Sequence, residues 1–121
     1  MKYFLFFCFA LGVHVSYSQQ VTDTTFANIL ADPDKYHRKD VVIFGYVNFE
    51  FEGDEIVLDT LNRRNRLWVG DMATELLPIK HFQYWNGRRV IMKGVFDKTN
   101  RGHMGMSKGT ITNVTVMKLV D

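Results

Sequence analysis

The chain has 121 residues, with 15 lysine and arginine residues, 13 aspartate and glutamate residues and a single cysteine. This length suits one domain around one hydrophobic core. The near balance of charge does not favour a dedicated nucleic-acid-binding protein, which would show a clear basic excess.

The first residues, MKYFLFFCFALGVHVSYSQQ, have the three-part layout of a cleavable secretory signal. One cation, Lys2, precedes an apolar run from Tyr3 to Val15, and small residues follow at Ser16 and Ser18. The run is too short for a membrane-spanning helix, and signal cleavage follows small residues. We therefore expect a signal peptide over residues 1–18 and a single domain over residues 19–121.

Removal of this segment has two consequences for the mature chain. Loss of Lys2 leaves 14 cations against 13 acids, a net charge of +1. Loss of Cys8 leaves no cysteine, which excludes disulfides, thiolate zinc sites and cysteine nucleophiles. We expect an exported protein, periplasmic or secreted, without a transmembrane segment in its mature form.

The mature chain begins with a predicted short helix in the segment TDTTFANILADPDKY. Phe26, Ile29 and Leu30 fall at positions i, i+3 and i+4, the spacing of one helical face. Asp32 precedes Pro33, which disfavours helical backbone at Asp32. The pattern predicts a helix that packs through this face and is interrupted at the proline.

Five β-rich segments follow the helix. The first has Val41, Ile43, Gly45, Val47, Phe49 and Phe51 on one face, the alternation expected of a half-buried strand. A polar segment, LNRRN at 61–65, is predicted as a loop, and MATELLPIKHFQYWN as a connecting helix interrupted by Pro78. The predicted strands are DVVIFGYVNFEFE (40–52), EIVLDT (55–60), RLWVGD (66–71), RRVIMKGVFDK (88–98) and GTITNVTVMKLV (109–120).

The first and fourth strands share a pattern, KDVVIFGYV and RRVIMKGVF, with Gly45 and Gly94 at the same place. A glycine inside a long strand is typical of a bulge or sharp coil where a small barrel bends. Three strands, a helix and two strands is the order of the OB-fold. We predict a mainly β fold: a five-stranded OB-fold-like Greek-key barrel with an N-terminal helix and a helix between strands three and four.

Three segments, ILADPDKYHRKDVVIFGYVNFEFEGDEIVLD, YWNGRRVIMKGVFD and GHMGMSKGTITNVTVM, carry a family resemblance over nearly the whole mature chain. The chain resembles a family of small uncharacterised exported bacterial OB-fold-like domains. In that family an FEG closes the first hairpin, and GHMG followed by Gly-Thr-Ile opens the last strand. Arg38 departs from the family, which has a glycine there. The resemblance implies the fold and carries no particular activity.

The segment NRGH, residues 100–103, is one residue away from the DRGH of metal-dependent nucleases, in which the histidine activates water. Here Asn100 replaces the aspartate, and the only downstream asparagine, Asn113, falls on a predicted strand instead of a helix. A four-residue match outside its structural context is weak. The alternative is a structural loop with three glycines and two methionines.

A binding site is predicted where OB-folds commonly bind, along strands two and three between two loops. The loop from 97 to 109 carries the candidates Lys98, Arg101, His103 and Lys108, and the opposing loop carries Glu50, Glu52, Asp54 and Glu55. Opposed signs disfavour an oligonucleotide, so nucleic acid is not an expected partner. The two loops could instead pair with each other.

The remaining candidates are aromatic. Phe44, Tyr46 and Trp68 with Arg66 could form a stacking platform for a sugar ring, a base or a partner side chain, unless the helices cover them.

A metal site or a cofactor site is less favoured by the sequence. Glu50, Glu52 and Asp54 alternate as calcium ligands could, but match no complete ligand loop, and His37 and His81 are isolated. We expect neither a metal nor a cofactor.

The sequence thus favours a non-catalytic, exported binding or scaffolding module whose partner is a protein, a glycan or a small molecule. Two alternatives stay open: a metal-dependent nuclease or phosphodiesterase that uses His103, and a purely structural envelope protein. Neither a nucleophile with an oriented base nor a pair of acids at catalytic spacing is found.

Overall fold

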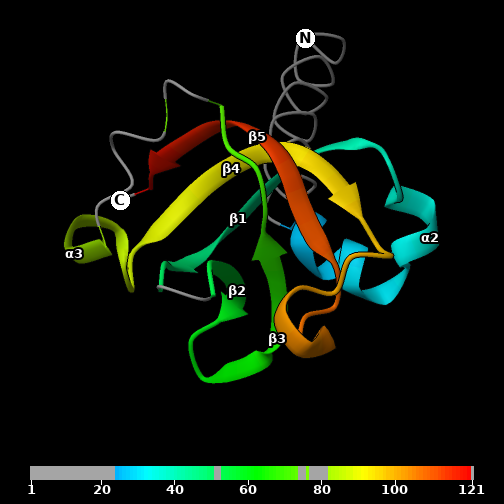
Figure 1. Ribbon diagram of the computed structural model, residues 1–121, viewed down its shortest axis with the longest axis horizontal. Coiled ribbons are helices and arrows are strands. Elements are labelled where there is room, and N and C mark those ends of the chain that lie inside the picture. Colours follow the sequence, from blue (N-terminus) through cyan, green and yellow to red (C-terminus); the bar gives the residue numbers. More distant parts are fainter. Residues whose placement is uncertain (1–23, 51–52, 74–75, 77–81, 121) are drawn as a thin grey trace, which may run out of the picture.

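The computed structural model describes residues 24–50, 53–73, 76 and 82–120. Residues 24–31 are helical, and two short helices and a 3-10 turn accompany five strands (Figure 1). The bounds are α2 Pro33–Tyr36, β1 Asp40–Asn48, β2 Glu55–Asp59, β3 Asn62–Val69, α3 Phe82–Trp85, β4 Arg89–Asp97, the 3-10 turn η2 His103–Gly105 and β5 Thr110–Leu119.

The five strands form one sheet that closes on itself in the order β1-β2-β3-β5-β4, because β1 also pairs with β4. Only β3 and β5 run parallel, and the other pairs are antiparallel. The prediction of a mainly β chain with five strands in one sheet is confirmed. In Figure 1 α2 and α3 lie on opposite sides of the sheet.

The alternation predicted for the first strand is confirmed for its described residues: Val41, Ile43, Gly45, Val47 and Phe49 are buried and the residues between them in β1 are half-buried. Phe51 lies outside the described residues. These side chains enter one apolar core with members of all five strands. Alternation follows from the two-residue period of a strand, which sends successive side chains to opposite faces.

The N-terminal helix closes part of this core, as its spacing predicts. Phe26 and Ile29 are fully buried, and Leu30 packs against the core. Asp32 leaves the helical region, with φ −144° and ψ 73°, and α2 begins at Pro33. The predicted interruption is therefore confirmed, because proline restricts the residue before it and fits the first turn of a new helix.

Gly45 and Gly94 are places where a neighbouring strand comes close. A Cβ on Gly45 would lie 2.8 Å from the carbonyl oxygen of Val57, and one on Gly94 would lie 2.7 Å from that of Thr112. The predicted bulge is confirmed at Gly94, where the β4–β5 register shifts between Lys93 and Val95. At Gly45 the β1–β4 register runs on without a shift, so close approach alone explains the glycine.

The predicted loop at 61–65 is wrong for four of its five residues, because β3 already begins at Asn62. Asp59 pairs with Asn62, so only Thr60 and Leu61 connect β2 to β3. The Asp59 carboxylate accepts a hydrogen bond from the Leu61 amide at 2.8 Å, which fixes this tight turn. The first three residues of β3 are exposed, so this strand end carries no apolar alternation to detect.

The predicted connecting helix between β3 and β4 is represented by α3, while Pro78 and His81 lie outside the described residues. Within the described ranges, no helix has the length and apolar character needed to cross a bilayer.

Candidate functional site

The outer face of β1, β2 and β3 carries most of the predicted aromatic and basic candidates. The register aligns Tyr46 with Val57 and Val57 with Arg66, and the next row aligns Asn48, Glu55 and Trp68. Residues paired across strands project from the same face of a sheet. The structure therefore brings Tyr46, Arg66 and Trp68 onto one surface.

This surface is not a continuous aromatic platform. Val57 and Glu55 stand between Tyr46 and Trp68 in the two rows. Phe44 lies one row further along β1, and the guanidinium of Arg89 sits 5.1 Å from its ring centre. Phe44 is therefore separated from Trp68, and its ring is covered by Arg89 of β4.

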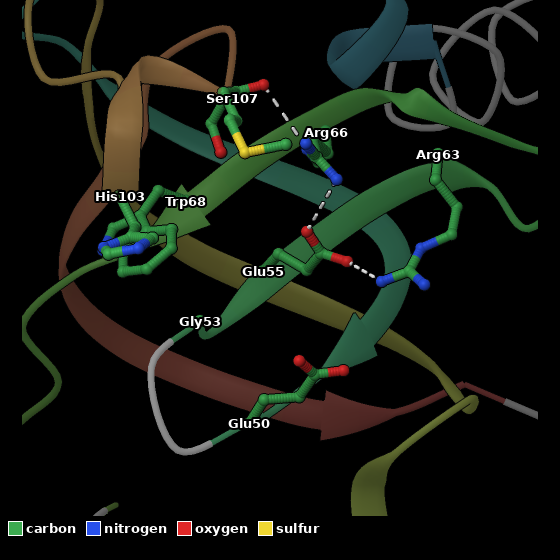
Figure 2. Close-up of a pocket in the computed structure, with 9 residues that line it drawn as sticks. Glu50, Gly53, Glu55, Arg63, Arg66, Trp68, His103 and Ser107 are labelled. Carbon is green, nitrogen blue, oxygen red and sulfur yellow. Dashed lines mark hydrogen bonds and ion pairs between the residues drawn. The ribbon is translucent and has the colours of Figure 1, made fainter.

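Glu55 organises the charge on this face. Its carboxylate, 8% exposed as a residue, accepts a hydrogen bond from Arg63 and lies 3.5 Å from Nη1 of Arg66. Figure 2 shows Glu55 between the two guanidinium groups. The hydrogen bond from Arg63 to Glu55 raises the pKa of Arg63 above its ordinary value. A carboxylate this deeply buried is tolerated because it is paired.

The arginines are oriented differently by their surroundings. The side chain of Arg66 is 19% exposed, and its Nε donates to the carbonyl oxygen of Met106 at 3.4 Å. The side chain of Arg63 is 57% exposed. Arg66 is thus held between β2 and the loop that follows β4, whereas Arg63 reaches toward solvent. Arg63 and the role of Glu55 were missed from sequence because the segment around Arg63 was assigned to a loop.

Trp68 fills the space between the two loops that border the face. A Cβ on Gly102 would lie 2.7 Å from atoms of the Trp68 ring, and one on Gly53 would lie 3.7 Å from it. Gly102 also has a left-handed φ of 73°. Glycine is required there for both conformation and close approach, since a side chain would displace the ring. Trp68 is accordingly half-buried.

The loop from 97 to 109 divides its candidate residues between two places. Lys98 turns away from the face: its Nζ lies 2.5 Å from the Asp34 carboxylate, and its amide donates to Nδ1 of His37 at 3.2 Å. Hydrogen bonding to Lys98 lowers the pKa of Asp34. The structure therefore does not bring Lys98 to the predicted site.

The other basic residues of this loop stay near the face. Arg101 donates from Nε to the carbonyl oxygen of Ser107 at 3.0 Å and closes the loop on itself. Lys108 donates its amide to the carbonyl oxygen of Arg66 at 3.1 Å, and its side chain is exposed. His103 is exposed at the start of η2, beside Trp68 in Figure 2. Only His103 of these three lines the hollow described next.

Two hollows adjoin on this surface. The Trp68 hollow, about 250 Å³, is lined by Glu50, Gly53, Glu55, Arg63, Arg66, Trp68, His103, Met106 and Ser107. The Tyr46 hollow, about 310 Å³, is lined by Tyr46, Val47, Asn48, Glu50, Glu55, Val57, Thr60, Arg63 and Gly87. They share Glu50, Glu55 and Arg63, so together they form one shallow groove across three strands.

The two oppositely charged loops were predicted as possible partners of each other. The ion pairs among the described residues join them to other parts of the chain instead. Glu55 pairs with the arginines of β3, and Lys98 pairs with Asp34. Glu50 accepts a hydrogen bond from Nδ2 of Asn48 at 2.7 Å. Glu52 lies outside the described residues. Of these acids, Glu55 is thus neutralised from within the sheet, by the arginines of β3.

The structure also shows the positions of the residues on which the nuclease and metal hypotheses depend. The Asn100 side chain accepts a hydrogen bond from the Gly102 amide at 3.1 Å, and Asn113 lies on β5 with φ 51°. Nδ1 of His37 accepts the Lys98 amide, and His81 lies outside the described residues. Among the residues with a described position, no three histidine, cysteine, aspartate or glutamate side chains are grouped as metal ligands would be.

Comparison of the chain with protein-family models and with curated proteins gives no match. The groove and its chemistry are therefore the basis for inferring a function.

Proposed function

We propose that the chain is a non-catalytic, exported OB-fold module that binds or scaffolds through the groove formed by the Trp68 and Tyr46 hollows. The OB-fold is supported by the strand order β1-β2-β3-β5-β4, with β1 paired to both β2 and β4 and β3 parallel to β5. Export, to the periplasm or beyond the cell, is supported by the signal-like segment before Gln19.

One observation carries the proposal: two hollows share residues and cross the outer face of β1, β2 and β3, beside the tip of the long loop. In an OB-fold this face, with its flanking loops, is where ligands commonly bind. The groove offers the flat ring of Trp68 and the guanidinium groups of Arg63 and Arg66. A partner with a planar or ring-shaped part and an acidic or carbonyl-rich part fits this combination.

The partner is a protein, a glycan or a small molecule. Glu50 and Glu55 line both hollows, and their carboxylates offset the positive charge of Arg63 and Arg66 that a continuous phosphate backbone would need. Arg63 and Arg66 share Glu55, so the groove is not a one-sided basic track. This charge pattern favours a ligand with one localised acidic group over a nucleic acid.

Binding can be located by amide chemical shifts of the exported protein titrated with acidic sugars, neutral sugars and short acidic peptides. We expect the largest shifts on β2, β3 and residues 102–108. Arg66→Met, which keeps the stem of the side chain, should weaken binding by about tenfold or more through loss of a charge-assisted hydrogen bond. Lys93→Met, at an exposed cation on β4, is the matched control and should leave the affinity unchanged.

Shifts confined to β4 and β5, or equal affinity for the wild type and a folded Arg66→Met, would contradict the proposed groove. Melting temperatures of both variants separate lost binding from lost folding. If none of the ligand classes binds at millimolar concentration, the structural envelope role is favoured instead.

A further inference from the structure

Large exposed apolar side chains gather at one end of the described molecule. Four such side chains are more than half exposed: Leu61 at 93%, Met104 at 82%, Met106 at 60% and Tyr84 at 52%. Tyr84 belongs to α3, whereas the other three lie on the turn between β2 and β3 and on η2 and the residue after it. Both turns lie at the lower edge of Figure 1, and Arg63 and Met106 line the same hollow.

The same end has a positive excess. Residues 59–66 and 98–108 contain six lysines and arginines and one acid, Asp59. Glu55 pairs with Arg63 and Arg66, and Asp34 pairs with Lys98. Glu50, which lines the same hollow as Arg63 and Met106, is a fourth acid, so six cations against four acids leave an excess of two positive charges, although the expected mature chain is nearly neutral. The cations are therefore concentrated around the exposed apolar tips.

Three backbone amides of the two tips have hydrogen-bond partners within the tips themselves. The Leu61 amide donates to the Asp59 carboxylate. In η2 the amides of Gly105 and Met106 donate to the carbonyl oxygens of Gly102 and His103. Tips with internal hydrogen bonds can enter a less polar medium at lower cost, because unsatisfied amides are expensive there.

We propose that this end docks on a membrane surface rich in anionic phospholipid. The docking end consists of Leu61, Met104 and Met106 with the exposed cations Arg63, Arg64, Arg101 and Lys108. Leu61, Met104 and Met106 enter the head-group region, and the cations contact lipid phosphates. This combination of apolar insertion and electrostatic attraction is how peripheral surfaces bind anionic bilayers.

The shape of this end favours a bilayer over a protein partner. The apolar side chains stand on two separate tight turns, each with cations a few residues away in the chain. A protein-binding patch has an apolar centre and a polar rim, whereas here the highly exposed apolar side chains stand on separate turns without a shared buried centre. A fluid head-group layer can accommodate separate apolar tips and many phosphate contacts together.

Vesicle co-sedimentation tests the proposal with the protein recovered from the exported fraction of expressing cells. The two vesicle types are phosphatidylcholine alone and an equal mixture of phosphatidylcholine and phosphatidylglycerol. We expect binding to the mixed vesicles only, and weaker binding as salt screens the charges. Arg64→Glu with Lys108→Glu should reduce the partition coefficient by about tenfold or more, since each cation contributes several-fold near an anionic surface.

The apolar contribution is tested by Leu61→Ser with Met104→Asn, which should reduce partitioning by about tenfold. Asparagine suits the left-handed backbone of Met104, φ 57°, so folding is preserved. The matched controls are Lys93→Glu with Lys118→Glu, at exposed cations of β4 and β5, and Tyr84→Ser.

Three results would overturn membrane docking: no sedimentation with either vesicle, equal sedimentation with both, or equal losses in the controls and the docking-end variants. Even if a variant is unstable, the dependence of wild-type vesicle binding on lipid charge and salt still tests membrane docking. Failure of the groove to bind its ligand leaves this result unaffected, because the vesicle assay contains no groove ligand.

Discussion

The two ends of the loop between β4 and β5 are fastened to the rest of the molecule, whereas its tip is exposed. At the ends, Lys98 pairs with Asp34, and the Thr110 hydroxyl donates to the carbonyl oxygen of Asn100 at 2.6 Å. At the tip, residues 103–106 are all exposed. A single glycine-rich segment therefore contains a rigid attachment and a surface available for contact, and the residue types alone do not separate them.

Two glycines with the same kind of backbone provide the sharpest test of this difference. Gly102 and Gly105 have φ values of 73° and 66°, but a Cβ on Gly102 would meet the Trp68 ring at 2.7 Å and one on Gly105 would meet nothing within 4 Å. Gly105→Ala should lower the free energy of unfolding by about 1 kcal/mol, because of the left-handed backbone alone. Gly102→Ala should cost about 3 kcal/mol, because the clash with Trp68 adds an overpacking cost.

Urea unfolding of the two variants, followed by circular dichroism, measures both costs. Equal destabilisation by the two substitutions would mean that Trp68 is not fixed by the loop. The conclusion that Trp68 packs between the two loops would then be wrong.

A third glycine, Gly94, lies in the closed sheet and away from the loop tip. Gly94→Val places a side chain within 2.7 Å of Ile111 and the Thr112 carbonyl oxygen, at the shifted β4–β5 register. We expect the free energy of unfolding to fall by about 2 kcal/mol, because the backbone and the core must shift to accommodate the side chain. Val95→Ala, next to it in β4 and half-buried, is the control for a change of strand side chain. An unchanged melting temperature for Gly94→Val would refute the close approach.

The fastened end of the loop should also respond to pH. Hydrogen bonds from the Thr99 side chain and amide lower the pKa of Asp97 below its ordinary 3.8. A depressed folded-state pKa stabilises the protein above the unfolded value, and this contribution is lost as the pH falls through the folded value. Wild type should therefore exceed Asp97→Asn in stability at neutral pH, and the difference should vanish well below pH 3.8. Urea midpoints at both pH values measure it, and a constant difference would contradict the assignment.

The smallest effect is expected at the exposed tip. His103→Ala should change the free energy of unfolding by less than about 0.5 kcal/mol, as surface substitutions generally do. Incubation of the wild type with plasmid and single-stranded DNA or RNA, with and without magnesium, should give no cleavage. A general base would instead lose about 10² to 10⁴ in rate on substitution. Metal-dependent cleavage by the wild type that His103→Ala abolishes would favour the nuclease alternative.

Local patterns predicted much of the framework. The alternation of β1, the interruption at Asp32 and the buried face of Phe26 and Ile29 follow from strand and helix periods and from proline. The glycine in β4 correctly marked a register shift. These features depend on residues close in sequence, whose geometry is nearly independent of the rest of the chain.

The start of β3 could not be predicted in the same way, because its exposed polar residues have no apolar alternation. Its strand character comes from pairing with β2 across the turn that Asp59 fixes. The partner of Lys98 was equally hidden, since Asp34 lies 64 residues away in the chain.

By itself the sequence determined which residues are suited to strands, where the first helix breaks and which side chains are candidates for binding. Only the tertiary structure decided that Glu55 is shared by two arginines, that Trp68 packs on Gly102 and that Lys98 leaves the site. The physical reason is that charge pairing and ring packing depend on distances between segments. Those distances are set by the closure of the sheet, which no local pattern contains.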